Sequence, residues 1–127
     1  MKTKTLIILF FGLLFYSCES GTEPEVKQAK VFEIHLQSSY NKTPVQVIFD
    51  SKIVLNDTIS TGSILAYAAI IPLKVSQGKH KMRAIINNIA KAETLLIVGD
   101  SLYATVNYNP ENNTICFGGQ TWPFPYK

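Results

Sequence analysis

Residues 31–37 read VFEIHLQ, and from the second position onward apolar and polar side chains alternate. Phe32, Ile34 and Leu36 fall on one side of an extended chain, and the polar side chains between them fall on the other. A period of two is typical of a half-buried β-strand. The run therefore predicts a strand with one face toward a core and the other toward solvent.

The same alternation recurs along the chain, interrupted by turns rich in Asn, Asp, Gly and Ser. Further strands are predicted at 45–49, 52–55, 70–75, 79–86, 90–98, 102–108 and 114–117, with a short piece at 58–60. About eight short strands at such spacing are typical of an antiparallel β-sandwich. We therefore expect an all-β fold, and its pattern resembles the immunoglobulin-like or jelly-roll-like domains of exported bacterial proteins.

Two further features of the sandwich follow from the residues. Residues 64–71 would suit a short buried helix, but Pro72 restricts the residue before it to extended geometry, so a loop leading into a strand is expected. The aromatic residues expected in the core are Phe32, Phe49, Tyr103, Tyr108 and Phe117.

The N-terminus has a different composition from the rest of the chain. Lys2 and Lys4 precede an apolar run over 6–16, which is followed by Ser17 and Cys18. A basic start and an apolar run of about eleven residues are typical of a secretory signal. A permanent membrane helix is the weaker alternative, because it needs about 20 apolar residues.

Residues 14–18, LFYSC, resemble the lipobox of bacterial lipoproteins, and the bulky residue before Ser17 is similar to lipoboxes of Bacteroidetes. The resemblance implies cleavage before Cys18 and acylation of that cysteine. It divides the chain into a signal peptide (1–17), an acylated cysteine with a polar tether (18–29) and one sandwich domain with an aromatic tail (30–127). The expected location is the bacterial cell envelope, lipid-anchored at the periplasmic or surface face of the outer membrane.

The second cysteine leaves an alternative open. If Cys18 is acylated, Cys116 stands alone in an apolar run, where we expect it to be a small buried hydrophobe. In an exported protein the two cysteines can instead form a disulfide. The lipid anchor is the interpretation that we favour.

Charge and composition narrow the classes of partner. The formal charge is +3, but removal of Lys2 and Lys4 with the signal leaves 10 basic side chains against 9 acidic ones. A nearly neutral chain lacks the basic surface that nucleic-acid binding requires. The cluster Lys79, His80, Lys81 and Arg83 suits anionic lipid or polysaccharide, although the solvent-facing side of an edge strand is the simpler interpretation.

The sequence contains no motif that predicts catalysis. His35 and His80 lack the spacing of a zinc site, and there is no Gly-x-Ser-x-Gly elbow or glycine-rich phosphate loop. We expect two solvated histidines, no catalytic residue, no metal and no cofactor. A calcium site built from the carboxylates at turns, Asp50, Asp57 and Asp100, is a weaker alternative.

The last ten residues, GGQTWPFPYK, combine three aromatic side chains with two prolines. Trp122, Phe124 and Tyr126 are candidate ligand-binding residues, because rigid aromatic rings stack on sugars and dock on proteins. The alternative, which we favour, is that Trp122 and Phe124 fold back and cover an open edge of the sandwich.

Two short segments, 57–59 and 100–102, resemble the Asp-(Ser/Thr)-aliphatic sites of general O-glycosylation in Bacteroidetes. The resemblance implies Thr58 and Ser101 as candidate O-glycosylation sites.

The sequence as a whole predicts a non-catalytic binding or assembly module. The partners expected are the membrane, through the N-terminal lipid, and another envelope protein or a polysaccharide, but not nucleic acid. The alternative function is a carbohydrate-binding module that uses the C-terminal aromatics, and an envelope enzyme is the weakest hypothesis.

Overall fold

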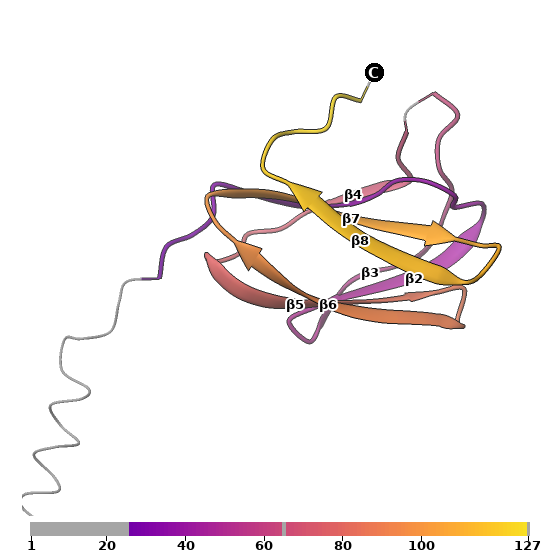
Figure 1. Ribbon diagram of the computed structural model, residues 1–127, viewed down its shortest axis with the longest axis horizontal. Coiled ribbons are helices and arrows are strands. Elements are labelled where there is room, and N and C mark those ends of the chain that lie inside the picture. Colours follow the sequence, from indigo (N-terminus) through magenta and orange to yellow (C-terminus); the bar gives the residue numbers. More distant parts are fainter. Residues whose placement is uncertain (1–25, 65, 127) are drawn as a thin grey trace, which may run out of the picture.

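The protein is described by a computed structural model over residues 26–64 and 66–126. Eight strands form two four-stranded sheets that pack face to face (Figure 1). The strands are β1 (Val31–Leu36), β2 (Thr43–Phe49), β3 (Lys52–Ile59), β4 (Ala69–Pro72), β5 (Gly78–Ile86), β6 (Ala90–Val98), β7 (Ser101–Asn109) and β8 (Thr114–Gln120). The predicted all-β sandwich is confirmed. In the described ranges no helix is long and apolar enough to cross a membrane.

The two sheets differ in how their strands are paired. The first has the order β4-β1-β7-β8, and the second has the order β3-β2-β5-β6. All pairs are antiparallel except β1 and β7, which run parallel with Val31 opposite Ser101. The first predicted strand therefore lies inside its sheet, between β4 and β7.

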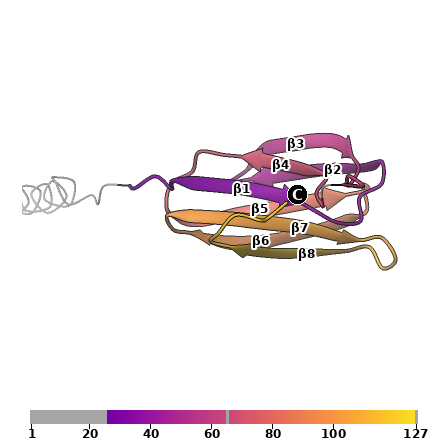
Figure 2. The same ribbon diagram turned by 90° about the horizontal axis from the view of Figure 1, so that it is seen from above.

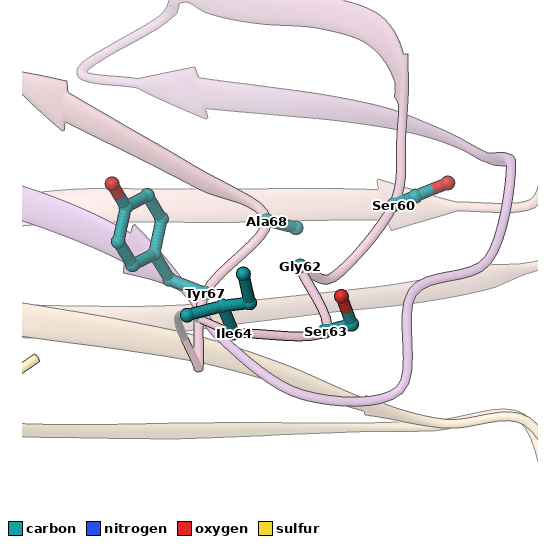
Figure 3. Close-up of a pocket in the computed structure, with 6 residues that line it drawn as sticks. All are labelled: Ser60, Gly62, Ser63, Ile64, Tyr67 and Ala68. Atoms are coloured by element: carbon teal, nitrogen blue, oxygen red, sulfur yellow. The ribbon is translucent and has the colours of Figure 1, made fainter. Parts of the chain in front are cut away.

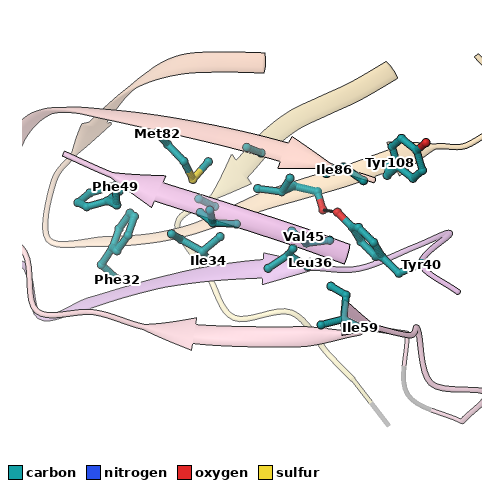
Figure 4. Packing of buried hydrophobic residues seen from close by; sticks show 14 of the residues in the cluster. Phe32, Ile34, Leu36, Tyr40, Val45, Phe49, Ile59, Met82, Ile86 and Tyr108 are labelled. Carbon is teal, nitrogen blue, oxygen red and sulfur yellow. Dashed lines mark hydrogen bonds between the residues drawn. The ribbon is translucent and has the colours of Figure 1, made fainter. Parts of the chain in front are cut away.

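The core lies between the sheets and is made by alternate residues of the strands (Figure 4). Phe32, Ile34 and Leu36 of β1 are almost fully buried, as the period of two predicts. The Phe32 ring lies 5.1 Å from that of Phe49, which comes from the opposite sheet. Burial of each such side chain contributes about 1.5–3 kcal/mol to stability, so the alternating residues hold the two layers together.

Tyr40 is a core residue that lies outside any strand. Its hydroxyl donates a hydrogen bond of 2.6 Å to the backbone oxygen of Val106, and burial raises its pKa well above the ordinary value. The hydrogen bond removes the cost of burying the phenol oxygen. Tyr40 therefore fastens the connection between β1 and β2 to the first sheet.

Some predictions about individual residues are wrong. Cys116 is exposed, because its neighbours Ile115 and Phe117 are the residues of β8 that turn toward the core. Tyr103 is buried, but it is not part of the core cluster and lies on the outward side of its strand. β3 is also longer than predicted, because β2 pairs with it over its whole length through an irregularity after Val47.

The sandwich has two distinct ends (Figures 1 and 2). We call the end at which residues 26–30 meet the sheets the proximal end. There Gln28 forms an isolated β-bridge with Ser76, and the backbone N–H of Lys30 donates to the backbone oxygen of Asp100. The opposite end, which we call the distal end, carries the connection between β3 and β4 and the turns after β5 and β7. The signal peptide, Cys18 and most of the predicted tether lie outside the described residues.

Candidate functional site

The C-terminal segment lies over the outer face of the first sheet, where it passes back toward β1 (Figure 2). It covers His35, whose side chain points away from the core yet is only 3% exposed. The prediction of a solvated histidine at this position is therefore wrong. The strand alternation places the side chain on the outer face as expected, but a segment 91 residues further along the chain buries it.

Both ring nitrogens of His35 have hydrogen-bond partners. Nδ1 lies 2.8 Å from the hydroxyl of Tyr126, and Nε2 lies 2.9 Å from a carboxylate oxygen of Glu33. Gln37 donates a further bond of 2.9 Å to the same hydroxyl. Every partner is satisfied if the Tyr126 hydroxyl donates to Nδ1 and Nε2–H donates to Glu33, which assigns a neutral imidazole.

Aromatic contacts reinforce these hydrogen bonds. The His35 ring lies 5.1 Å from Phe124 and stacks on Tyr126 at 5.5 Å. Tyr126 in turn lies 4.7 Å from Tyr67, which belongs to the distal loop. We call the whole group the aromatic latch, and its members are Glu33, His35, Gln37, Tyr67, Phe124 and Tyr126.

Trp122 does not take part in the aromatic latch. Its side chain is 64% exposed, and its backbone oxygen accepts a bond of 2.8 Å from the Gln120 side chain. The structure thus separates the three C-terminal aromatics, with Phe124 and Tyr126 packed on the sheet and Trp122 in solvent. They do not form one open platform.

The chemistry of the aromatic latch favours a structural role. Burial, and to a smaller extent the neighbouring Tyr67 and Glu33, raise the pKa of Tyr126, although the bond from Gln37 opposes this. A phenol with a raised pKa stays protonated at neutral pH and is a weak nucleophile. His35 is too deeply covered to meet a substrate. In the described residues no three His, Cys, Asp or Glu side chains are grouped to hold a metal ion.

Two hollows at the distal end lie next to the aromatic latch. The first has a volume of about 410 Å³, is lined by Ser60, Gly62, Ser63, Ile64, Tyr67 and Ala68, and is drawn in Figure 3. Tyr67 lines this hollow and also packs on Tyr126, so the aromatic latch supports one of its walls. Ile64 is 85% exposed at its rim.

The second hollow has a volume of about 500 Å³ and lies beside the turn between β7 and β8. Its lining includes Ser38, Asn107 and Cys116. The Asn107 side chain accepts a bond from the Ser38 backbone and donates one to Gln37, which belongs to the aromatic latch. Both hollows are therefore joined to the aromatic latch, through Tyr67 and Gln37.

The second histidine belongs to a separate polar group at the proximal end. His80 Nδ1 lies 2.5 Å from a carboxylate oxygen of Asp50, and Nε2 lies 2.7 Å from the backbone oxygen of Ser76. The prediction that His80 is solvated is therefore wrong. Both partners of the ring are acceptors, so the protonated imidazolium fits them best.

The pKa values of this pair follow from the geometry. Partial burial disfavours the charge on each group, but their mutual hydrogen bond and charge outweigh it. The pKa of His80 is raised and that of Asp50 is lowered. Backbone bonds add to both shifts, from Lys81 N–H to Asp50 and from His80 to Ser76.

The remaining predicted positions lie apart from the aromatic latch. Thr58 is exposed on β3, and Ser101 is half-buried at the first position of β7, opposite Val31. Cys18 lies outside the described residues. Glu33, Gln37 and Tyr67 were not predicted as site residues, and nothing local in the sequence marks them.

The fold and the candidate site define this protein as a two-layered β-sandwich in which the C-terminal segment packs on the outer face of the first sheet at β1. Comparison with protein-family models and with curated proteins finds no match for this chain.

Proposed function

We propose that this chain is a lipid-anchored lipoprotein of the bacterial cell envelope, and that its sandwich is a non-catalytic binding or assembly module. The lipobox-like segment that ends at Cys18 supports the anchor. The proposed binding role rests on one observation, which is that the chain enters the sandwich at one end and carries two hollows at the other. The chain enters at the proximal end, where a hollow of about 390 Å³ lies beside Asp50 and His80, while the hollows of about 410 and 500 Å³ lie at the distal end. A partner would therefore be met on the side away from the lipid.

The distal hollows suit a contact surface of modest size. Exposed serine and asparagine side chains alternate with the exposed Ile64 and the half-buried Tyr67. Aromatic side chains are enriched and acidic side chains depleted at the centre of protein interfaces, which agrees with Tyr67 and the uncharged lining of the first hollow. The aromatic latch holds Tyr67 in place, which lowers the entropy lost on binding.

The test is capture of a partner from intact envelopes by cross-linking and co-purification. We expect a partner that is retained by the wild type and lost when Ile64 is replaced, in Ile64→Asp. The matched control is Ile89→Asp, which changes an isoleucine that is 67% exposed and lines neither hollow. Absence of any stable partner, or equal loss with the control, would count against a contact at the first hollow.

Exposure of Trp122 favours a second candidate, a carbohydrate-binding module. A single exposed indole can stack on one sugar ring. Because Phe124 and Tyr126 are packed on the sheet, this module would depend on Trp122 alone among the C-terminal aromatics. A glycan array with the wild type and Trp122→Ala tests it, and binding that survives the substitution would contradict it.

A further inference from the structure

The charged side chains of the described residues are distributed unevenly between the two ends. Six of the nine lysine and arginine side chains surround the proximal end, and all six are exposed: Lys27, Lys30, Lys52, Lys74, Lys79 and Lys81. The carboxylates at that end are Asp50, Asp100 and Glu93, which lies beside Lys81, so these side chains leave a formal charge of +3. At the distal end Lys42 and Lys91 balance Asp57 and Glu111.

The acidic groups at the proximal end are already engaged. Asp50 accepts from His80 and from the backbone of Lys81, and Asp100 accepts from the Gln77 side chain. Glu93 lies 3.9 Å from Lys81, but both side chains are largely exposed, so the pair is weak. Most of the lysine charge at this end is therefore available to an anionic partner.

Exposed aliphatic side chains accompany these lysines. Of the seven large apolar side chains that are exposed in the described residues, four lie beside a lysine of the proximal end. Two of these side chains are next to a lysine in the sequence, Val26 with Lys27 and Ile53 with Lys52. The other two lie on β6 directly opposite a lysine of β5, Ile97 opposite Lys79 and Leu95 opposite Lys81. Leu95 and Ile97 are 66% and 75% exposed, which is costly in water unless something covers them.

We propose that the proximal end, with the adjoining outer face of β5 and β6, docks on a bilayer surface that contains anionic phospholipids. Lysines that attract headgroups, together with aliphatic side chains that enter the acyl boundary, are the two components of peripheral membrane binding. The orientation rests on the proposed lipid anchor. Seven residues lie between Cys18 and Val26, so eight Cα-to-Cα steps hold the proximal end within about 28 Å of the anchor.

The tether makes even a weak surface attraction effective, because it converts docking into an intramolecular step at high effective concentration. The docked domain would direct its distal hollows away from the bilayer. The same surface could otherwise bind a second copy of the chain, and the experiment separates these two occupants.

The experiment uses the unlipidated chain from Glu19 to Lys127, which contains both sheets and the whole described core. Its partition is measured by sedimentation with vesicles of phosphatidylcholine alone and with vesicles in which about one third of the lipid is phosphatidylglycerol. We expect binding to the anionic vesicles only. Binding should weaken when salt rises from about 0.1 M to about 1 M, which shortens the Debye length from about 10 Å to about 3 Å.

Matched double variants locate the surface. The double variant Lys52→Glu with Lys79→Glu should lower the partition to anionic vesicles at least about tenfold. Its control, Lys42→Glu with Lys91→Glu, makes the same change in charge at the distal end and should retain more of the binding. Leu95→Ser with Ile97→Ser tests the apolar component, and Ile64→Ser with Ile89→Ser is its control. Circular dichroism checks that each variant is folded.

The proposal is overturned if the folded wild type does not bind anionic vesicles, or if both members of a matched pair lose binding equally. It is also overturned if sedimentation equilibrium shows a dimer of the wild type that Leu95→Ser with Ile97→Ser abolishes. The anchor is tested separately, by mass spectrometry of Cys18. A failed anchor leaves the vesicle result unchanged, so the two failures are distinguishable.

Discussion

His35 and His80 show how the partners of a ring nitrogen set the role of a histidine. At His35 the Tyr126 hydroxyl already accepts from Gln37, so its own proton completes the network if it goes to Nδ1 of a neutral ring. At His80 a carboxylate and a carbonyl oxygen face the two nitrogens, so a charged ring completes it. The first histidine fastens the C-terminal segment, and the second joins the β2–β3 turn to the residues before β5.

Tyr126→Phe tests the aromatic latch. The substitution keeps the ring but removes the hydroxyl that bonds His35 and Gln37, and it leaves a buried ring nitrogen without its partner. We expect a loss of about 1–2 kcal/mol in the free energy of unfolding, measured by urea denaturation. The control is Trp122→Ala, which should change stability by less than about 0.5 kcal/mol because the side chain is exposed. Equal losses in the two variants would mean that the hydroxyl contributes nothing specific.

Asp50→Asn tests the polar pair through its pH dependence. The raised pKa of His80 stabilises the fold below its ordinary value of 6.5, and this contribution is lost as pH rises through the raised value. The lowered pKa of Asp50 stabilises the fold above its ordinary value of 3.8, and this contribution is lost as pH falls through the lowered value. The free energy of unfolding of the wild type should therefore exceed that of Asp50→Asn most between pH 3.8 and pH 6.5.

The size of that difference is limited by solvent. The Asp50 side chain is 45% exposed, so screening should keep the effect at or below about 1 kcal/mol. Urea denaturation at a series of pH values measures it. Asp57→Asn, on an exposed strand position away from either histidine, should produce no such window. A difference between wild type and Asp50→Asn that is constant across pH would contradict the ion-pair assignment.

At the scale of single elements, β8 depends on a glycine at one place. A Cβ atom at Gly118 would lie 2.8 Å from the hydroxyl of Thr105, which faces it across the β7–β8 ladder. Gly118→Ala should therefore destabilise the fold by about 1–3 kcal/mol in thermal or urea denaturation. Gly99→Ala is the matched control, because a Cβ atom there has open space around it. In a Thr105→Ala background the cost of Gly118→Ala should fall, and an undiminished cost would rule out this contact as the cause.

The strands themselves were predictable because each satisfies a local rule. In β1 the alternation of Phe32, Ile34 and Leu36 matches the buried face position by position. The turns after β2 and β5 carry Asp50 with Ser51 and Asn87 with Asn88, all at positive φ, as tight hairpins require. These signals need no knowledge of the rest of the chain.

The predictions that were wrong for His35 and His80 concern contacts with residues that are distant in the sequence. The burial of His35 arises from Phe124 and Tyr126, and the pairing of His80 arises from the β2–β3 turn. Cys116 was placed on the wrong face because its whole neighbourhood is apolar, so the period could be read in either phase. Strand order, and with it the parallel pairing of β1 and β7, is likewise a property of the assembled sheets.

At the scale of the whole molecule, counting reactive thiols tests the anchor. Cys116 is exposed and should react with a maleimide in the folded chain. The sequence contains 2 cysteines, so the protein extracted from membranes should react at Cys116 alone if Cys18 is acylated. Mass spectrometry of the labelled protein measures this. Two reactive thiols would show an unmodified Cys18, and none under non-reducing conditions would indicate the disulfide.

The parallel pairing of β1 has a mechanical consequence. The segment that leads from Cys18 joins the start of β1, which is bonded to β4 on one side and to β7 on the other. A pull between the membrane and a partner at the distal end would act along the axis of β1. Both ladders would then be loaded in shear, so that many backbone hydrogen bonds share the force instead of opening in turn. We therefore expect the domain to withstand tension between its two attachment points better than a sandwich that is pulled from an edge strand.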